Sequence, residues 1–191
     1  MAWTKTPREI RERLAELRRV DRRYEVHGVA DHRYELRAPL TSDELAAAEA
    51  QFGVSLPEDY AFFLTELGAG GAGPGYGLFP LVLDERTWKW SDEDGQRPGD
   101  LASPFPHTSE WNFDDHPLWA DQPTESQFAD VEAFEDADST WRDDLEALFW
   151  QPQHTRGAVC LGHLGCGLLA WLVVSGPERG HVWSSSDAPG S

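Results

Sequence analysis

Hydrophobic side chains recur at helical spacing in the first part of the chain, beginning with residues 6–20. This stretch opens with Thr6-Pro7-Arg8-Glu9, a capping box with proline at the first helical position. We therefore predict a helix over residues 6–20, whose opposite face is rich in arginine and glutamate. Its apolar positions are Ile10, Leu14 and Leu17.

Two further helices are predicted from similar signals. Thr41-Ser42-Asp43-Glu44 is a second capping box, and Gly53 is a typical C-terminal stop for the helix that it opens. Pro57 suits the first turn of a third helix, and Gly68 ends that helix. The apolar positions are Leu45, Ala48 and Phe52 in the first of these helices and Tyr60, Phe63, Leu64 and Leu67 in the second.

Strands are predicted most clearly near the C-terminus. Residues 158–164, 168–174 and 181–183 form three apolar runs separated by glycine-containing turns, which predicts an antiparallel meander. Residues 78–83 predict another strand. Apolar and polar residues alternate weakly over residues 24–37, which could form short strands. Helices that precede strands indicate an α+β fold. We expect an antiparallel sheet, a meander of about five to six strands, with helices packed on one side.

Composition also indicates how the chain is organised into domains. Residues 1–33 hold the basic N-terminal helix and its connection, and residues 34–191 are expected to form the main domain. Within that domain, residues 84–127 show little periodicity and many aspartate, proline and tryptophan residues. Residues 128–149 are acidic and are expected to be helical near Trp141–Phe149.

Charge limits the class of partner. The 191 residues carry a net charge of −18, with +3 on residues 1–40 and −21 on residues 41–191. Nucleic acids and anionic membranes attract positive surfaces, so we expect neither as a partner. Two interpretations remain open: the acidic surface provides solubility, or it attracts a cationic protein. The N-terminus lacks the apolar core of a signal peptide, so we expect a cytoplasmic protein.

No motif for catalysis, a cofactor or a metal is found. The glycine-rich loop 68–77 follows a predicted helix and contains no lysine, so it lacks the pattern of a P-loop, and we interpret it as a flexible connection that needs positive φ angles. Cys160, His163 and Cys166 lack the fourth ligand of a structural zinc site, and we interpret both cysteines as small reduced hydrophobes. No GxSxG elbow occurs. We therefore expect a protein that is not an enzyme.

Aromatic rings interleaved with carboxylates are the strongest candidate for a binding surface. Rings anchor protein interfaces and carboxylates pair with lysine and arginine, so this composition fits a cationic protein face. The alternative is that the rings pack beneath an irregular loop as a small core. The predicted partner-binding residues are Trp88, Trp90, Asp92, Glu93, Asp94, Trp111, Asp114 and Asp115.

Several segments in a defined order resemble one known family. Residues 40–49, with the sequence Leu-Thr-Ser-Asp-Glu-Leu-Ala-Ala-Ala-Glu, are followed by Phe52-Gly53, by Leu56-Pro57-Glu58-Asp59-Tyr60 and by the glycine-rich loop. This order is similar to that of the SMI1/KNR4 (SUKH) superfamily. The later segments that match its pattern are Pro104-Phe105-Pro106 with Trp111, the glycine-rich hairpin 157–167, and residues 172–183.

The resemblance covers about residues 34–183 and implies an α+β fold with helices packed against an antiparallel sheet. For the bacterial members it implies an immunity protein that binds and neutralises a polymorphic toxin, often a nuclease. Other members are regulatory or scaffolding modules that bind a host protein, and this alternative stays open here. No catalytic motif accompanies the family. The basic N-terminal helix lies outside the shared pattern.

Overall fold

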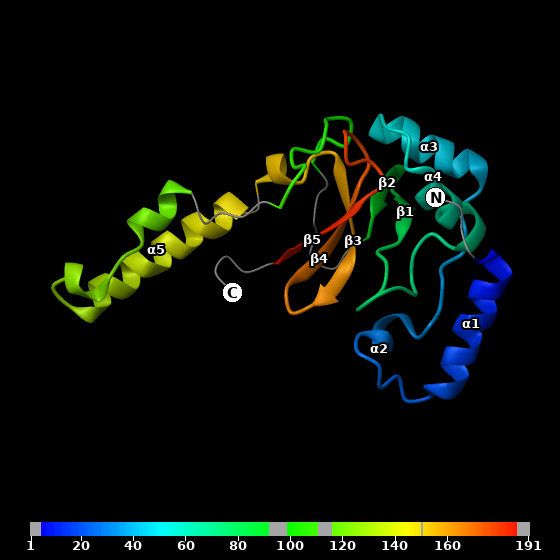
Figure 1. Ribbon diagram of the computed structural model, residues 1–191, viewed down its shortest axis with the longest axis horizontal. Helices are drawn as coiled ribbons and strands as arrows, with labels where there is room; N and C mark the ends of the chain where they lie inside the picture. Colours follow the sequence, from blue (N-terminus) through cyan, green and yellow to red (C-terminus); the bar gives the residue numbers. More distant parts are fainter. Residues whose placement is uncertain (1–4, 92–98, 111–115, 150, 187–191) are drawn as a thin grey trace.

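The computed structural model describes residues 5–91, 99–110, 116–149 and 151–186 (Figure 1). Its helices and helical turns are α1 (Pro7–Val20), α2 (Val29–His32), α3 (Ser42–Phe52), α4 (Glu58–Phe62), the π-helical η1 (Phe63–Leu67), η2 (Pro117–Asp121), η3 (Glu125–Gln127), α5 (Val131–Phe149) and η4 (Pro152–His154). Its strands are β1 (Leu81–Asp84), β2 (Thr87–Trp90), β3 (Ala158–Gly165), β4 (Leu168–Val173) and β5 (Val182–Ser186).

The strands form two antiparallel sheets in a mixed helix and sheet fold. β3, β4 and β5 pair in that order, with Trp171 of β4 opposite both Cys160 and Trp183. This confirms the three strands predicted near the C-terminus. β1 and β2 form a separate hairpin, in which Leu81 lies opposite Trp90. β2 was not predicted, because it lies in the stretch that lacks clear periodicity.

The prediction of a single meander of five to six strands is not confirmed. Residues 24–37 contain α2 and turns, because Gly28, Arg33 and Tyr34 have φ angles of 75°, 50° and 59°, which an extended strand cannot adopt. Within this stretch, Leu36 makes an isolated bridge with Gly71, which also bridges to Leu78.

These irregular segments nevertheless lie side by side with the three-stranded sheet. The amide of Arg37 donates to the carbonyl of Gly70 at 2.9 Å, and the amide of Leu78 donates to the carbonyl of Gly71 at 2.7 Å. The amide of Phe79 in turn donates to the carbonyl of Leu161 on β3 at 2.7 Å. Backbone hydrogen bonds thus continue from residues 35–38 to β3 without regular strands.

The three-stranded sheet is apolar on both faces. Val159 and Leu172 point to one face, where they share a core with Leu64 of η1, Ala48 of α3 and Trp90 of β2. On the other face lies a second core made of Phe105, Ala158, Cys160, Leu169, Trp171 and Val173. α3, α4, η1 and the β1–β2 hairpin therefore cover one face, and the segment that contains Phe105 covers the other.

Local sequence signals explain where the helices begin and end. α1 and α3 both start at the predicted capping boxes, with Thr6 and Thr41 as N-caps. Gly53 ends α3 in the left-handed conformation. α5 begins at Val131, well before the predicted helical stretch, so the acidic helix is longer than expected.

The outer edge of β2 is closed by a side chain. Gln51 of α3 donates from Nε2 to the carbonyl of Trp88 at 2.7 Å, and the amide of Trp88 donates to Oε1 of Gln51 at 2.7 Å. The side-chain amide thus makes both hydrogen bonds that a neighbouring strand would make at this residue. An edge strand whose backbone groups are satisfied is a poor template for pairing with another chain.

The glycine-rich loop is closely packed against its neighbours, which the sequence did not predict. Its glycines do adopt positive φ angles, among them Gly70, Gly71 and Gly77. A Cβ added at Gly75 would lie 2.6 Å from the carbonyl oxygen of His163, and one added at Gly28 would overlap the carbonyl of Gly75. The loop is therefore held between the N-terminal segment (residues 5–38) and β3, where side chains cannot fit.

Alanine at Gly28 tests this packing, with Gly53 as a matched control. Both glycines are left-handed, at φ angles of 75° and 67°, but a Cβ at Gly53 would meet nothing within 4 Å. We expect Gly53→Ala to lower the free energy of unfolding by about 1 kcal/mol from backbone strain alone. Gly28→Ala should cost a further ~1–3 kcal/mol from overpacking. Urea unfolding measures both, and equal costs would contradict the close packing.

Candidate functional site

Trp88 and Trp90, predicted as partner-binding rings, are core residues. Each is 7% exposed and belongs to the core that α3 and η1 cover. Trp90 stacks on Phe52 with ring centroids 4.8 Å apart, and its Nε1 donates to the hydroxyl of Tyr60 at 2.9 Å. Burial raises the pKa of Tyr60 to about 12, so this hydroxyl stays neutral. In this structure neither indole is presented to a partner.

The other six predicted partner-binding residues lie outside the described residues. Their role in binding therefore stays a prediction. They are Asp92, Glu93, Asp94, Trp111, Asp114 and Asp115.

A different acidic surface is well defined, on residues 117–149, which we call the acidic arm. The arm holds ten aspartate and glutamate residues and one arginine, a net charge of −9, half that of the whole chain. α5 packs on η2 and η3 within the arm and extends away from the two sheets (Figure 1). The arm thus places a dense negative charge at one end of the molecule.

The arm has a small apolar core of its own. Trp141 of α5 is 8% exposed and meets Trp119 edge to face, with ring centroids 5.4 Å apart. Its Nε1 donates to the carbonyl of Leu118 at 2.8 Å. Phe128 and Phe134 form a second ring pair at 6.0 Å. Since the apolar side of α5 is used inside the arm, its polar side is left for solvent or a partner.

The polar side of α5 is almost entirely anionic. Asp138 pairs with Arg142 at 2.7 Å within the helix. Six further carboxylates of α5 are exposed, and no ion pair neutralises them among the described residues: Glu132, Glu135, Asp136, Asp143, Asp144 and Glu146. Sequence reasoning recognised this acidic helix but did not select it as a site. The density of carboxylates on one helix, with a single cation, was the signal that could have identified it.

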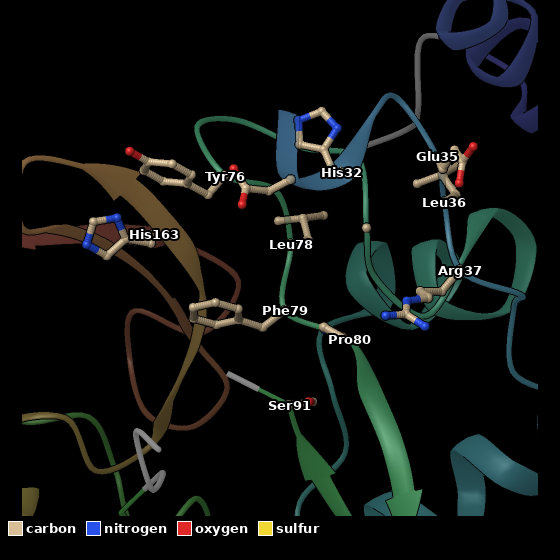
Figure 2. Close-up of a pocket in the computed structure, with 12 residues that line it drawn as sticks. His32, Glu35, Leu36, Arg37, Tyr76, Leu78, Phe79, Pro80, Ser91 and His163 are labelled. Carbon is tan, nitrogen blue, oxygen red and sulfur yellow. The ribbon is translucent and has the colours of Figure 1, made fainter. Parts of the chain in front are cut away.

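A cleft of about 670 Å³ lies elsewhere, between the N-terminal segment and β3 (Figure 2). Its walls come from α2 and the residues that follow it, from the glycine-rich loop, and from His163 on β3. Leu78, Phe79 and Pro80 lie between these walls. No sequence spacing predicted this cleft, because its lining residues are spread from position 31 to position 163.

The ionisable groups of the cleft include two carboxylates and one guanidinium. Asp31 and Glu35 line the cleft together with Arg37. Burial of the His32 ring lowers its pKa, and the charge of Asp31 offsets this only in part, so His32 is neutral at pH 7. The Nδ1 atom of His163 accepts a hydrogen bond from the amide of Gly165 at 3.1 Å.

The cysteines differ from each other. Both are free, and Cys160 is 6% exposed in the second core, as expected for a small hydrophobe. Cys166 is exposed at the β3–β4 turn, so its interpretation as a buried hydrophobe is wrong. In the described part of the chain, no three histidine, cysteine or carboxylate side chains gather to hold a metal ion. Among the described helices, none is both long and apolar enough to cross a bilayer.

Substitutions at Trp90 and Tyr60 test the assignment of these rings to the core. Trp90→Ala should lower the free energy of unfolding by about 3–5 kcal/mol, because it leaves a large cavity. Tyr60→Phe removes only the acceptor for the buried indole N–H and should cost about 1–3 kcal/mol. Guanidinium unfolding measures both values. A cost below about 1 kcal/mol for Trp90→Ala would instead indicate an exposed ring.

Comparison with known proteins places the chain in a family. A search of the curated proteins finds no match, and a search of the solved structures finds none either. The family model of the SMI1 / KNR4 family (SUKH-1) matches residues 39–190, which include the acidic arm, both sheets and the helices from α3 onward, but not α1 or α2. The family suggested by the order of the sequence motifs is therefore confirmed, and the chain belongs to the SMI1/KNR4 family (SUKH-1).

Proposed function

We propose that this protein is an immunity-type binding module that neutralises a basic polymorphic toxin. Membership of the SMI1/KNR4 family carries the proposal, because the family is consistent with immunity-type or binding modules. The net charge of −18 supports the choice of a basic partner. Neutralisation would be steric and electrostatic, without a chemical step.

The acidic arm is the surface that we assign to the first encounter with the toxin. Of its charge of −9, −6 lies on the projecting helix α5, whose apolar side is already packed (Figure 1). Opposite charges on two proteins raise the rate of association and disfavour wrong partners. A nuclease fits this requirement, because an enzyme that binds nucleic acid presents a basic face.

A pull-down from the source cells, with the full chain as bait, tests the proposal. The bait is washed at low and then at high salt, and retained proteins are identified by mass spectrometry. We expect one basic, toxin-like protein that is retained at low salt and released more readily at high salt, because exposed charges are screened. Retention only of host regulatory proteins would overturn the immunity role and favour a regulatory or scaffolding module.

A charge-matched pair of variants then tests the arm. The arm variant carries Glu132→Gln, Glu135→Gln and Glu146→Gln, all on exposed positions of α5. The control variant carries Glu58→Gln, Glu66→Gln and Glu85→Gln, all exposed and outside the arm. Both change the net charge equally, so only the location of the charge differs.

We expect the arm variant to slow association with the captured partner by about 10-fold at low salt, because the lost charges lie at the docking surface. The control variant should slow it by no more than about 2-fold, since its charges lie on α4, η1 and the β1–β2 turn, on the other side of the sheet from α5 (Figure 1). Stopped-flow or surface-binding kinetics measures both rates. Equal effects of the two variants would show that the arm is not the docking surface.

A further inference from the structure

The residues that line the cleft lie partly outside the range that the family model matches. Asp31, Glu35 and Arg37 precede the residues that the family model matches, whereas Tyr76, Phe79 and His163 lie within them. We propose that this cleft binds a cationic side chain, an arginine or a lysine, that the basic partner presents. This inference rests on the proposed function and assigns a second contact to the same partner.

Aromatic rings supply one side of the cleft. Tyr76 is 41% exposed, although it is held between His27 at 5.2 Å and His163 at 5.4 Å between ring centroids. Figure 2 shows Tyr76 and His163 on one side of the cleft, with Phe79 beside them. The face of an aromatic ring attracts a cation, and a fixed ring loses little entropy when it does so.

Asp31 supplies the complementary charge. Asp31 is exposed on α2, and no ion pair neutralises it among the described residues. Glu35 already binds one guanidinium of this chain, since its Oε1 lies 2.7 Å from Nη1 of Arg18. The charge of Glu35 is therefore already matched within this chain, and Asp31 remains available for a cation of the partner.

Arg37 determines where the cation binds. Its side chain lies on the opposite side of the cleft from Tyr76 and His163 (Figure 2). Repulsion by this guanidinium places an incoming cation at the Tyr76 end. Arg37 is then free to donate to a carbonyl or carboxylate next to the bound side chain. The volume of about 670 Å³ has room for an arginine side chain and the backbone that carries it.

Small probes test the cleft without the partner. N-acetyl-argininamide is the cationic probe, N-acetyl-citrullinamide is its neutral isostere, and the amide of N-acetyl-glutamate is the anionic probe. Each is titrated into the full chain while NMR follows the ring resonances of Tyr76 and His163. We expect saturable shifts in the millimolar range with the arginine probe and none with the citrulline probe.

Three variants locate the contact. Asp31→Asn is isosteric and exposed, and it should weaken binding of the arginine probe about 3- to 5-fold, as expected for loss of one partly screened charge pair. Tyr76→Leu should abolish saturable binding. Asp143→Asn, which makes the same change on the acidic arm, should leave binding unchanged. The unfolding curve of each variant shows whether the fold is retained.

Three results would overturn the proposal: equal shifts with citrulline and arginine, tighter binding of the glutamate probe, or no shift up to about 50 mM probe. A dissociation constant above about 50 mM is too weak for the cleft to contribute to binding of the partner. Unchanged binding by Asp31→Asn would also contradict it. Since the probes need no toxin, a cleft that binds arginine while the bait captures no basic protein would refute only the proposed function. A basic protein captured by a chain whose cleft ignores arginine would refute only the cleft.

Discussion

The fold depends on the need to cover a small sheet that is apolar on both faces. Val159 and Leu172 face one way, and Cys160 and Trp171 face the other, so neither side of β3 and β4 can be left in water. α3, α4, η1 and the β1–β2 hairpin cover one face, and Trp88 and Trp90 are therefore buried in the core. The segment around Phe105 covers the other face. A partner can therefore bind only to surfaces that are not buried against the two faces of this sheet.

Strong local signals allowed much of this fold to be predicted. The capping boxes at Thr6 and Thr41 placed two helices, and continuous apolar runs placed β3, β4 and β5. The strands expected in residues 24–37 are not formed, because Arg33 and Tyr34 adopt positive φ angles. Such angles leave no trace in a pattern of alternating hydrophobicity, because that pattern reports the burial of side chains and not the sign of φ.

The candidate binding surfaces were harder to predict from the sequence than the fold was. An indole near carboxylates has the same local sequence whether it anchors a partner or, like Trp90, donates to a buried Tyr60 hydroxyl. The acidic arm was visible as composition, but its projection from the sheets depends on the tertiary fold (Figure 1). The cleft joins Asp31 to His163 across most of the chain, so only the folded protein brings its residues together.

The separate core of the acidic arm has an evolutionary consequence. Because Trp119, Phe128 and Trp141 stabilise the arm from within, substitutions on its outer helical face need not disturb the cores beneath the sheets. Sites that are far apart and share no partners usually contribute additively to stability. If the arm binds the toxin as proposed, its outer face can change with the toxin while the rest of the fold retains its folding free energy.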